Sequence, residues 1–167
     1  MLASSRHVSA ADRARLDLAD DRVLAAVVLD DGRRAVATRR ALFLLDEDSV
    51  DRGLWCDVDR GSLDPETRAL TVHWVSGAAD RLVLGTQRAS VAFAQTFRER
   101  VQQSVVHAVT VTTPDGRSLR VALRRDEEGA LFTQVVGEDA VDLSDPAVLA
   151  VVERAEADLR EAVGLRR

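Results

Sequence analysis

The sequence predicts an α+β fold in which antiparallel strands form most of the core and two amphipathic helices pack against them. Short apolar runs alternate with segments rich in Gly, Pro and Asp, a pattern typical of antiparallel sheets. Two segments, 89–101 and 144–164, instead repeat apolar residues every three to four positions, which is the period of a helix. Hydrophobic residues make up 46% of the chain and charged residues 31%, so a packed core is expected.

The first three strands follow a short lead-in, residues 1–20, in which a capping pattern starting at Ser9 predicts a brief helix or turn. The Asp-Gly pair at positions 31 and 32 is a hairpin signal, because Gly adopts the positive φ that a tight turn requires. The strands predicted on either side of this turn and directly after it are 23–29, 35–39 and 41–45.

Strands continue after the acidic segment 46–51, which we expect to be a solvated loop because it lacks the ligand pattern of a calcium loop. Leu70, Val72 and Trp74 alternate with polar residues, which predicts a strand buried on one face. The predicted strands are 53–59, 69–75 and 81–84, separated by turns at 61–67 and 76–80.

A helix is predicted next, because Ala89, Phe93, Phe97 and Val101 are four positions apart and therefore share one helix face. We expect this helix to cover one side or end of the preceding sheet.

The last third of the chain predicts a smaller sheet and a terminal helix. Ser144 or Asp145 caps the helix, Pro146 occupies its first turn, and Gly164 ends it. No linker precedes this part, so it should pack against the first. The predicted strands are 105–112, 118–124 and 130–136, and the apolar stripe of the helix is Val148, Val152, Ala155, Leu159 and Val163.

Part of the chain resembles a known family. The runs 23–29 and 35–45, the second of which contains Ala-Thr-Arg-Arg, are similar to the second and third strands of bacterial pleckstrin-homology-like (PH-like) and GRAM-like domains. Trp55 and Val58 resemble the Trp and Val of the strand that follows in that family, and 97–101 falls in its closing helix.

The resemblance covers about residues 22–106 and implies an antiparallel β-barrel or sandwich closed by a helix. It divides the chain into a lead-in (1–20), a PH-like domain (21–105) and a three-stranded sheet with a C-terminal helix (106–167) packed on that domain. Members of the family bind lipids, peptides or proteins, so the resemblance implies a binding scaffold without specifying its ligand.

Composition excludes several chemistries. The chain has no Lys, which rules out P-loop phosphate binding and Schiff-base catalysis. Its net charge of −5 disfavours nucleic acid as a partner. No apolar run reaches the ~18 residues of a transmembrane helix and no signal-peptide pattern is present, so we expect a cytoplasmic protein without a transmembrane segment. Peripheral lipid binding stays an alternative.

No catalytic residue, metal or cofactor is predicted. His7, His73, His107 and the single cysteine, Cys56, lack the spacing of metal ligands. Cys56 lies beside Trp55, which fits a core position rather than a nucleophile. The enzymatic alternative is hydrolase-like chemistry at His73 or His107 with a neighbouring carboxylate.

Arginines provide the one positive indication of a ligand. Guanidinium groups form paired hydrogen bonds with phosphate or carboxylate, and two groups of arginines are close in the sequence. Arg120 and Arg124 are expected to share one strand face. The residues predicted to form an anion site are Arg33, Arg34, Arg39 and Arg40.

Taken alone, the sequence favours a non-catalytic interaction module that binds another protein or its own copy along an uncovered strand edge. The alternative is recognition of an anionic lipid headgroup or a nucleotide at the four predicted arginines.

Overall fold

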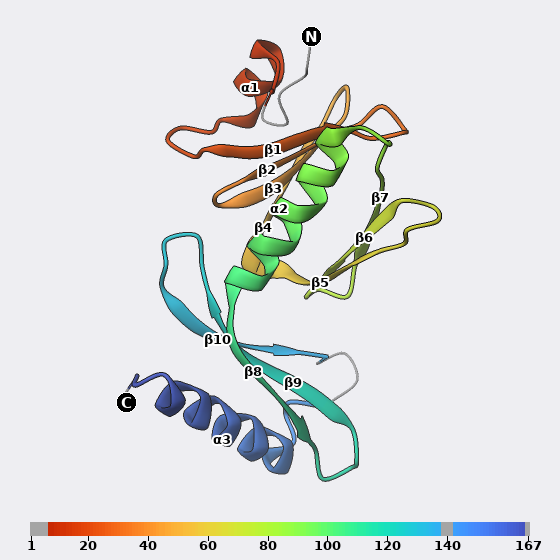
Figure 1. The fold of residues 1–167 in the computed structure, drawn as a ribbon. Helices are drawn as coiled ribbons and strands as arrows, with labels where there is room; N and C mark the ends of the chain where they lie inside the picture. Colours follow the sequence, from red (N-terminus) through yellow and green to blue (C-terminus); the bar gives the residue numbers. More distant parts are fainter. Residues whose placement is uncertain (1–6, 138–141, 166–167) are drawn as a thin grey trace.

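The structure, a computed structural model, describes residues 7–137 and 142–165 (Figure 1). It confirms the α+β class, with three α-helices and three antiparallel sheets in that part of the chain. The elements in order are α1 (Ala10–Leu16), β1 (Val23–Val28), β2 (Arg34–Thr38), β3 (Ala41–Leu45), β4 (Val50–Leu54), the 3-10 turn η1 (Trp55–Asp57), β5 (Val58–Leu63), β6 (Ala69–Trp74), β7 (Ala79–Val83), α2 (Arg88–Ser104), β8 (Val105–Thr112), β9 (Ser118–Arg125), β10 (Leu131–Val136) and α3 (Pro146–Ala162).

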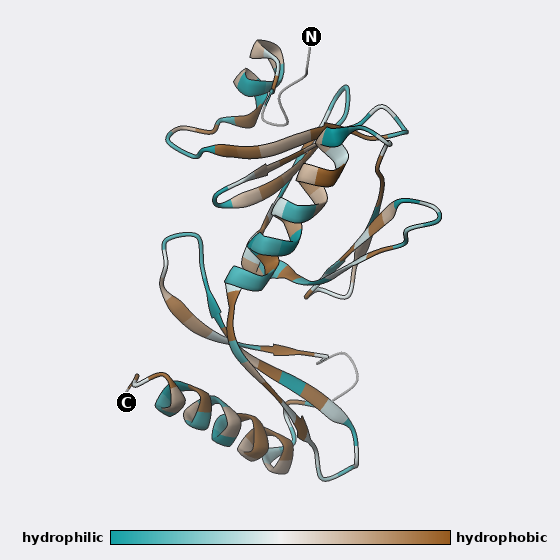
Figure 2. Ribbon diagram, viewed as in Figure 1, coloured by the Kyte–Doolittle hydropathy of each residue, from teal (hydrophilic) through white to brown (hydrophobic). Residues whose placement is uncertain are grey.

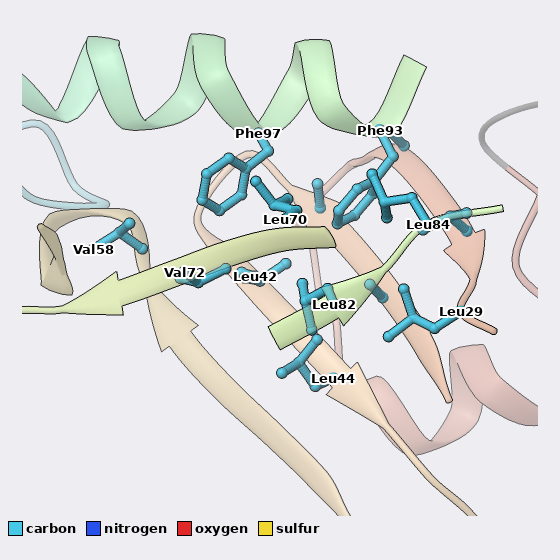
Figure 3. Packing of buried hydrophobic residues seen from close by; sticks show 14 of the residues in the cluster. Leu29, Leu42, Leu44, Val58, Leu70, Val72, Leu82, Leu84, Phe93 and Phe97 are labelled. Atoms are coloured by element: carbon cyan, nitrogen blue, oxygen red, sulfur yellow. The ribbon is translucent and has the colours of Figure 1, made fainter. Parts of the chain in front are cut away.

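Residues 7–104, called the first part below, contain two of the sheets and α2. The first sheet has the order β1-β2-β3-β4 and the second the order β5-β6-β7. The side chains of Phe93 and Phe97, which share one face of α2, insert between strands of the two sheets (Figure 3). Both phenylalanines are buried, as the four-residue spacing predicts. Replacing such a residue by Ala typically costs about 3–5 kcal/mol of stability.

The other face of the first sheet is covered by α1 and the segment after it. Leu16 and Leu18 pack on Val36, Phe43 and Leu45. The first sheet is therefore buried on both faces along β2 and β3, which explains why β3 is apolar at all five positions instead of alternating. The predicted short helix is confirmed, and the Ser9 hydroxyl caps it by accepting the Asp12 N–H at 3.0 Å.

The predicted barrel is not closed. The Asp30 N–H donates to the Val83 carbonyl at 3.0 Å, and an isolated bridge pairs Leu29 with Leu84. No further strand pairing among the described residues joins the first two sheets. Within residues 7–104, backbone pairing therefore joins the two sheets only where the ends of β1 and β7 meet, and α2 packs against β1 and β5.

The single strand predicted over 53–59 is also wrong. η1 interrupts it, so β4 ends at Leu54 in the first sheet and β5 begins at Val58 in the second. The cause is tertiary: the Trp55 side chain is buried in this turn, and its indole N–H donates to the Thr38 carbonyl at 3.0 Å. The neighbouring boundaries shift accordingly, because β4 begins within the predicted acidic loop and β5 extends into the predicted turn 61–67.

The second part, residues 105–137 and 142–165, is a sheet of order β10-β9-β8 with α3 on one face. Figure 1 shows α3 on the face turned away from the first part. Leu119, Val121 and Leu123 of β9 point to α3 and meet the predicted stripe from Val148 to Leu159. Figure 2 shows that these strands are mostly hydrophobic, whereas the β9–β10 turn is hydrophilic.

The ends of α3 agree with the sequence except at one position. Asp145 is the N-cap residue, and its side chain accepts the Ala147 N–H at 2.8 Å. At the C-terminus, the N–H groups of Gly164 and Leu165 donate to the carbonyls of Glu161 and Arg160, the pattern of a Schellman motif. Val163, predicted to extend the buried stripe, lies beyond the helix and is exposed.

Arginines of β9 connect the second part to the first. Arg120 forms an ion pair with Asp59 of β5. Arg124 is fully buried, and its Nη1 donates to the Val58 carbonyl at 2.9 Å and to the Ser104 hydroxyl at 3.3 Å. The two residues do share a strand face, as predicted, and that face lies against the first part.

We expect Gly61→Ala to destabilise the protein by about 1–3 kcal/mol, the usual cost of overpacking a core. A Cβ at position 61 would overlap with the ring of Phe97, which is buried and has no room to move. Urea denaturation measures the effect. Gly85→Ala is the matched control, because a Cβ there makes only ordinary contacts, the nearest at 3.7 Å. Equal stability of the two variants would contradict the packing of α2 on β5.

Candidate functional site

The structure does not bring the four predicted arginines together. Arg33 and Arg34 lie at the start of β2, whereas Arg39 and Arg40 lie just beyond its end. A five-residue strand at about 3.3 Å per residue separates the two pairs by roughly 16 Å. Proximity in the sequence was therefore a poor guide, because the strand between the two pairs is extended.

Three of these arginines have carboxylate partners. Arg33 pairs with Asp31 at 2.8 Å, and Arg34 pairs with Asp12 of α1 at 2.9 Å. Arg40 pairs with Asp20, also at 2.8 Å. The exposed Arg39 side chain is different, since no hydrogen bond or ion pair engages it among the described residues. At the start of β2, the ion pairs of Arg33 and Arg34 hold the local structure in place and do not form a site.

Arg39 and Arg40 instead meet arginines from distant parts of the sequence. They line a cleft of about 430 Å³ together with Arg100 of α2 and Arg125 of β9, and we call it the junction cleft because both parts contribute to it. Trp55, Cys56, Gln103 and Ser104 line it too, and the β9–β10 turn contributes Asp126, Glu127, Glu128 and Gly129.

Arg100 was not selected from the sequence, Arg125 was not placed beside Arg39 and Arg40, and the burial of Arg124 was not predicted. Arg100 directly precedes Val101 of the apolar face of α2, and nothing local indicates that the β2–β3 turn lies beside it. Arg124 was expected to share a strand face with Arg120, and it is buried at the contact between the two parts. The apolar run Val121–Leu123 directly before position 124 is the one local signal of that burial.

The histidines do not form a catalytic pair. His73 is half-buried on β6 and His107 is exposed on β8, in different sheets. Neither histidine is hydrogen-bonded to a carboxylate in the part of the chain that the structure describes. No three His, Cys, Asp or Glu side chains gather as metal ligands within residues 7–137 and 142–165.

A second surface feature is the free edge of β8. This strand ends the third sheet, and its eight residues include no charged side chain and no proline. The Arg-bearing strands β4, β5 and β7 also lie at sheet edges, but their charged side chains discourage pairing with another strand. β8 lacks that protection.

An apolar groove of about 510 Å³ runs beside β8, between the strand and α3. Val109 and Val111 form its strand side, and Ala150, Val151, Arg154, Ala155 and Asp158 form its helix side. Arg154 and Asp158 are the only charged residues in this lining, and they pair with each other at 3.0 Å. We call β8 with this groove the β8 surface.

Comparison with known proteins gives no relative for the chain. No family model matches it, and neither the curated proteins nor the solved structures include a match. In the described residues, no helix is long and apolar enough to cross a membrane. The function must therefore be inferred from the junction cleft and the β8 surface.

The β10 edge is a weaker candidate than the β8 surface. β10 is uncharged as well, but all six of its residues are half-buried. Its Thr133 is also tied to α3, because the threonine hydroxyl donates to Glu156 at 2.7 Å and accepts from Arg160 at 3.0 Å. The β8 surface combines an open edge with an adjacent apolar groove.

We expect Cys56 to react slowly with alkylating reagents at neutral pH. Burial is the main cause that raises the pKa of its thiol to about 11, and the nearby Asp57 and Glu127 carboxylates contribute to this increase. The thiolate is the reactive form, so the rate should increase with pH up to that pKa. Mass spectrometry of iodoacetamide labelling between neutral and alkaline pH measures it. A rate that is already maximal near neutral pH would show an accessible, activated thiol instead.

Proposed function

We propose that this protein is a non-catalytic interaction module that associates with a second copy of itself through the β8 surface. The observation that carries the proposal is an uncharged, eight-residue edge strand bordered by an apolar groove. Such an edge presents unpaired backbone N–H and C=O groups, which another strand can satisfy by extending the sheet.

A two-fold axis at the middle of β8 is compatible with the position of α3. The helix packs across β8 and β9, so its axis lies about half a strand spacing inside β8. The two-fold axis lies midway between the two paired β8 strands, and therefore half a strand spacing outside β8. With strands about 4.8 Å apart, the two copies of α3 are about 10 Å apart, which is close to the 8–10 Å of directly packed helices.

This arrangement also fills the groove. The apolar side chains Val151 and Ala155 of one copy face those of the other, on the same side of a continuous six-stranded sheet. Val111 of β8 packs near the start of α3, and Val106 packs near its end, so strand and helix run in opposite directions. The axis at the middle of β8 therefore passes near Ala155.

The two charged residues of the groove, Arg154 and Asp158, have opposite charges and can pair between the two copies across that axis. In antiparallel helices related by an axis near Ala155, Arg154 of one copy faces the stretch that contains Asp158 of the other. A two-fold interface requires self-complementary surfaces of this kind. A general protein partner has no such constraint, which is why a second copy is the occupant favoured here.

The first part then serves as a binding scaffold of the PH-like type. Its support is the order of elements, namely four strands, three strands and a helix whose phenylalanines reach between both sheets. We place the protein in the cytoplasm, where a single buried thiol needs no disulfide partner.

We expect the wild-type chain to be a dimer and Val151→Glu to be a monomer. The substitution puts a charge into the apolar groove at a half-buried surface position, so folding should be preserved. Leu149→Glu is the matched control, because Leu149 is an exposed apolar residue on α3 outside the groove. Sedimentation equilibrium gives the mass, and circular dichroism checks the fold.

Charge reversal provides a test that does not depend on apolar burial. Arg154→Asp should weaken the dimer, and adding Asp158→Arg should restore it, because the second change recreates opposite charges across the axis. A wild-type chain that stays monomeric at ~100 μM would overturn the proposal, since a complex with a Kd of about 1 μM is mostly formed there.

A further inference from the structure

The junction cleft is separate from the β8 surface, and its charges are divided between its two sides. Arg39 and Arg40 come from the turn between β2 and β3, and Arg100 comes from the C-terminal half of α2. The β9–β10 turn provides Arg125 and the carboxylates. One side of the cleft therefore carries only guanidinium groups among its charged side chains.

Two of these guanidinium groups repel each other. Arg100 is half-buried, and burial together with the charge of Arg39 lowers its pKa from the ordinary value, while the nearby Glu99 and Asp21 carboxylates act in the opposite direction. Its Nη1 donates to the backbone carbonyl of Arg39 at 3.4 Å, a long contact with a neutral acceptor. No carboxylate forms an ion pair with Arg39 or Arg100 among the described residues. An anion placed between them would replace this repulsion by attraction.

A further guanidinium lies behind the floor of the cleft. Ser104 lines the cleft, and its hydroxyl contacts Nη1 of the buried Arg124 at 3.3 Å. Within the described residues, Nε and Nη2 of Arg124 have no hydrogen-bond partner, so no carboxylate neutralises it directly. Cys56, also in the floor, stays a neutral thiol because its pKa is about 11. The floor therefore adds positive charge, which the nearby Asp57 carboxylate partly offsets.

The carboxylates of the turn only partly offset the arginines. Asp126 Oδ1 accepts the N–H groups of Glu128 and Ala130, at 2.9 and 2.8 Å, and so holds the turn itself. Glu127 lies toward Arg52, at 3.9 Å. The Glu128 carboxylate neither accepts a hydrogen bond within the turn nor lies toward an arginine outside the cleft, among the contacts of the described residues. The C-terminus of α2 contributes about half a negative charge, which is small beside the arginines.

We propose that the junction cleft binds a phosphate group, held between Arg39 and Arg100. Guanidinium groups suit a tetrahedral oxyanion because each donates two parallel hydrogen bonds, and a multiply charged anion satisfies two arginines at once. A cleft of about 430 Å³ accommodates a small phosphorylated molecule or the headgroup of a phosphorylated lipid. Arg40, already paired with Asp20, contributes mainly long-range attraction.

The experiment titrates the full-length protein with inorganic pyrophosphate at constant ionic strength and follows binding by calorimetry. Arg39→Gln should reduce the affinity roughly ten-fold, as expected for the loss of a charge-assisted contact. Arg33→Gln is the matched control, because it changes the net charge equally but lies at the opposite end of β2. Glu128→Gln should increase the affinity, since it removes the uncommitted carboxylate of the cleft.

A second arm tests vesicles of phosphatidylcholine containing a phosphatidylinositol phosphate. Binding of pyrophosphate alone assigns the site to a soluble phosphorylated ligand, and binding of vesicles that Arg39→Gln abolishes assigns it to a lipid headgroup. The proposal is overturned if neither probe binds saturably, or if Arg33→Gln weakens binding as much as Arg39→Gln. Val151→Glu should bind pyrophosphate like the wild type, so failure of self-association and failure of this site are distinguishable.

Discussion

The buried guanidinium of Arg124 is the contact on which the arrangement of the molecule depends. The Arg124 side chain extends from β9, and its guanidinium donates to the Val58 carbonyl at the start of β5 and to the Ser104 hydroxyl at the end of α2. Burying a charge without a carboxylate partner is costly, so removing its acceptors would be strongly unfavourable. The contact therefore fixes one face of the third sheet against the first part, with the Arg120–Asp59 ion pair beside it.

This constraint determines which surfaces are left for binding. α3 covers the other face of the third sheet, so β8 keeps only its outer edge free. The same contact brings the β9–β10 turn opposite the end of α2 and the β2–β3 turn, which creates the junction cleft. The two proposed functions thus arise from one contact but use different residues, and each can fail without the other.

Local signals predicted much of the fold. The first hairpin, α2 and α3 follow from turn residues and helical spacing, because these patterns act over a few neighbouring positions. The split of 53–59 into two strands depends on the indole of Trp55 reaching Thr38, a contact that is distant in the sequence. Whether a barrel closes likewise depends on pairing between distant strands, which no local pattern encodes.

The candidate sites were less predictable for the same reason. Arg39 and Arg40 could be selected from the sequence, but their companions Arg100 and Arg125 come from elements that only the tertiary fold brings near. The burial of Arg124 was not predicted, because alternation along a strand does not reveal that a second layer covers its polar face. The sequence predicted an uncovered strand edge without indicating which strand forms it. In the structure, the β8 edge is flanked by an apolar groove.

Amide hydrogen exchange along β8 tests the central claim most directly. In an antiparallel edge strand, alternate residues direct their N–H groups outward, away from the neighbouring strand. Pairing with a second copy predicts that these outward amides are protected and that their protection increases with protein concentration. Outward amides that exchange rapidly at every concentration, while those paired with β9 stay protected, would contradict the account.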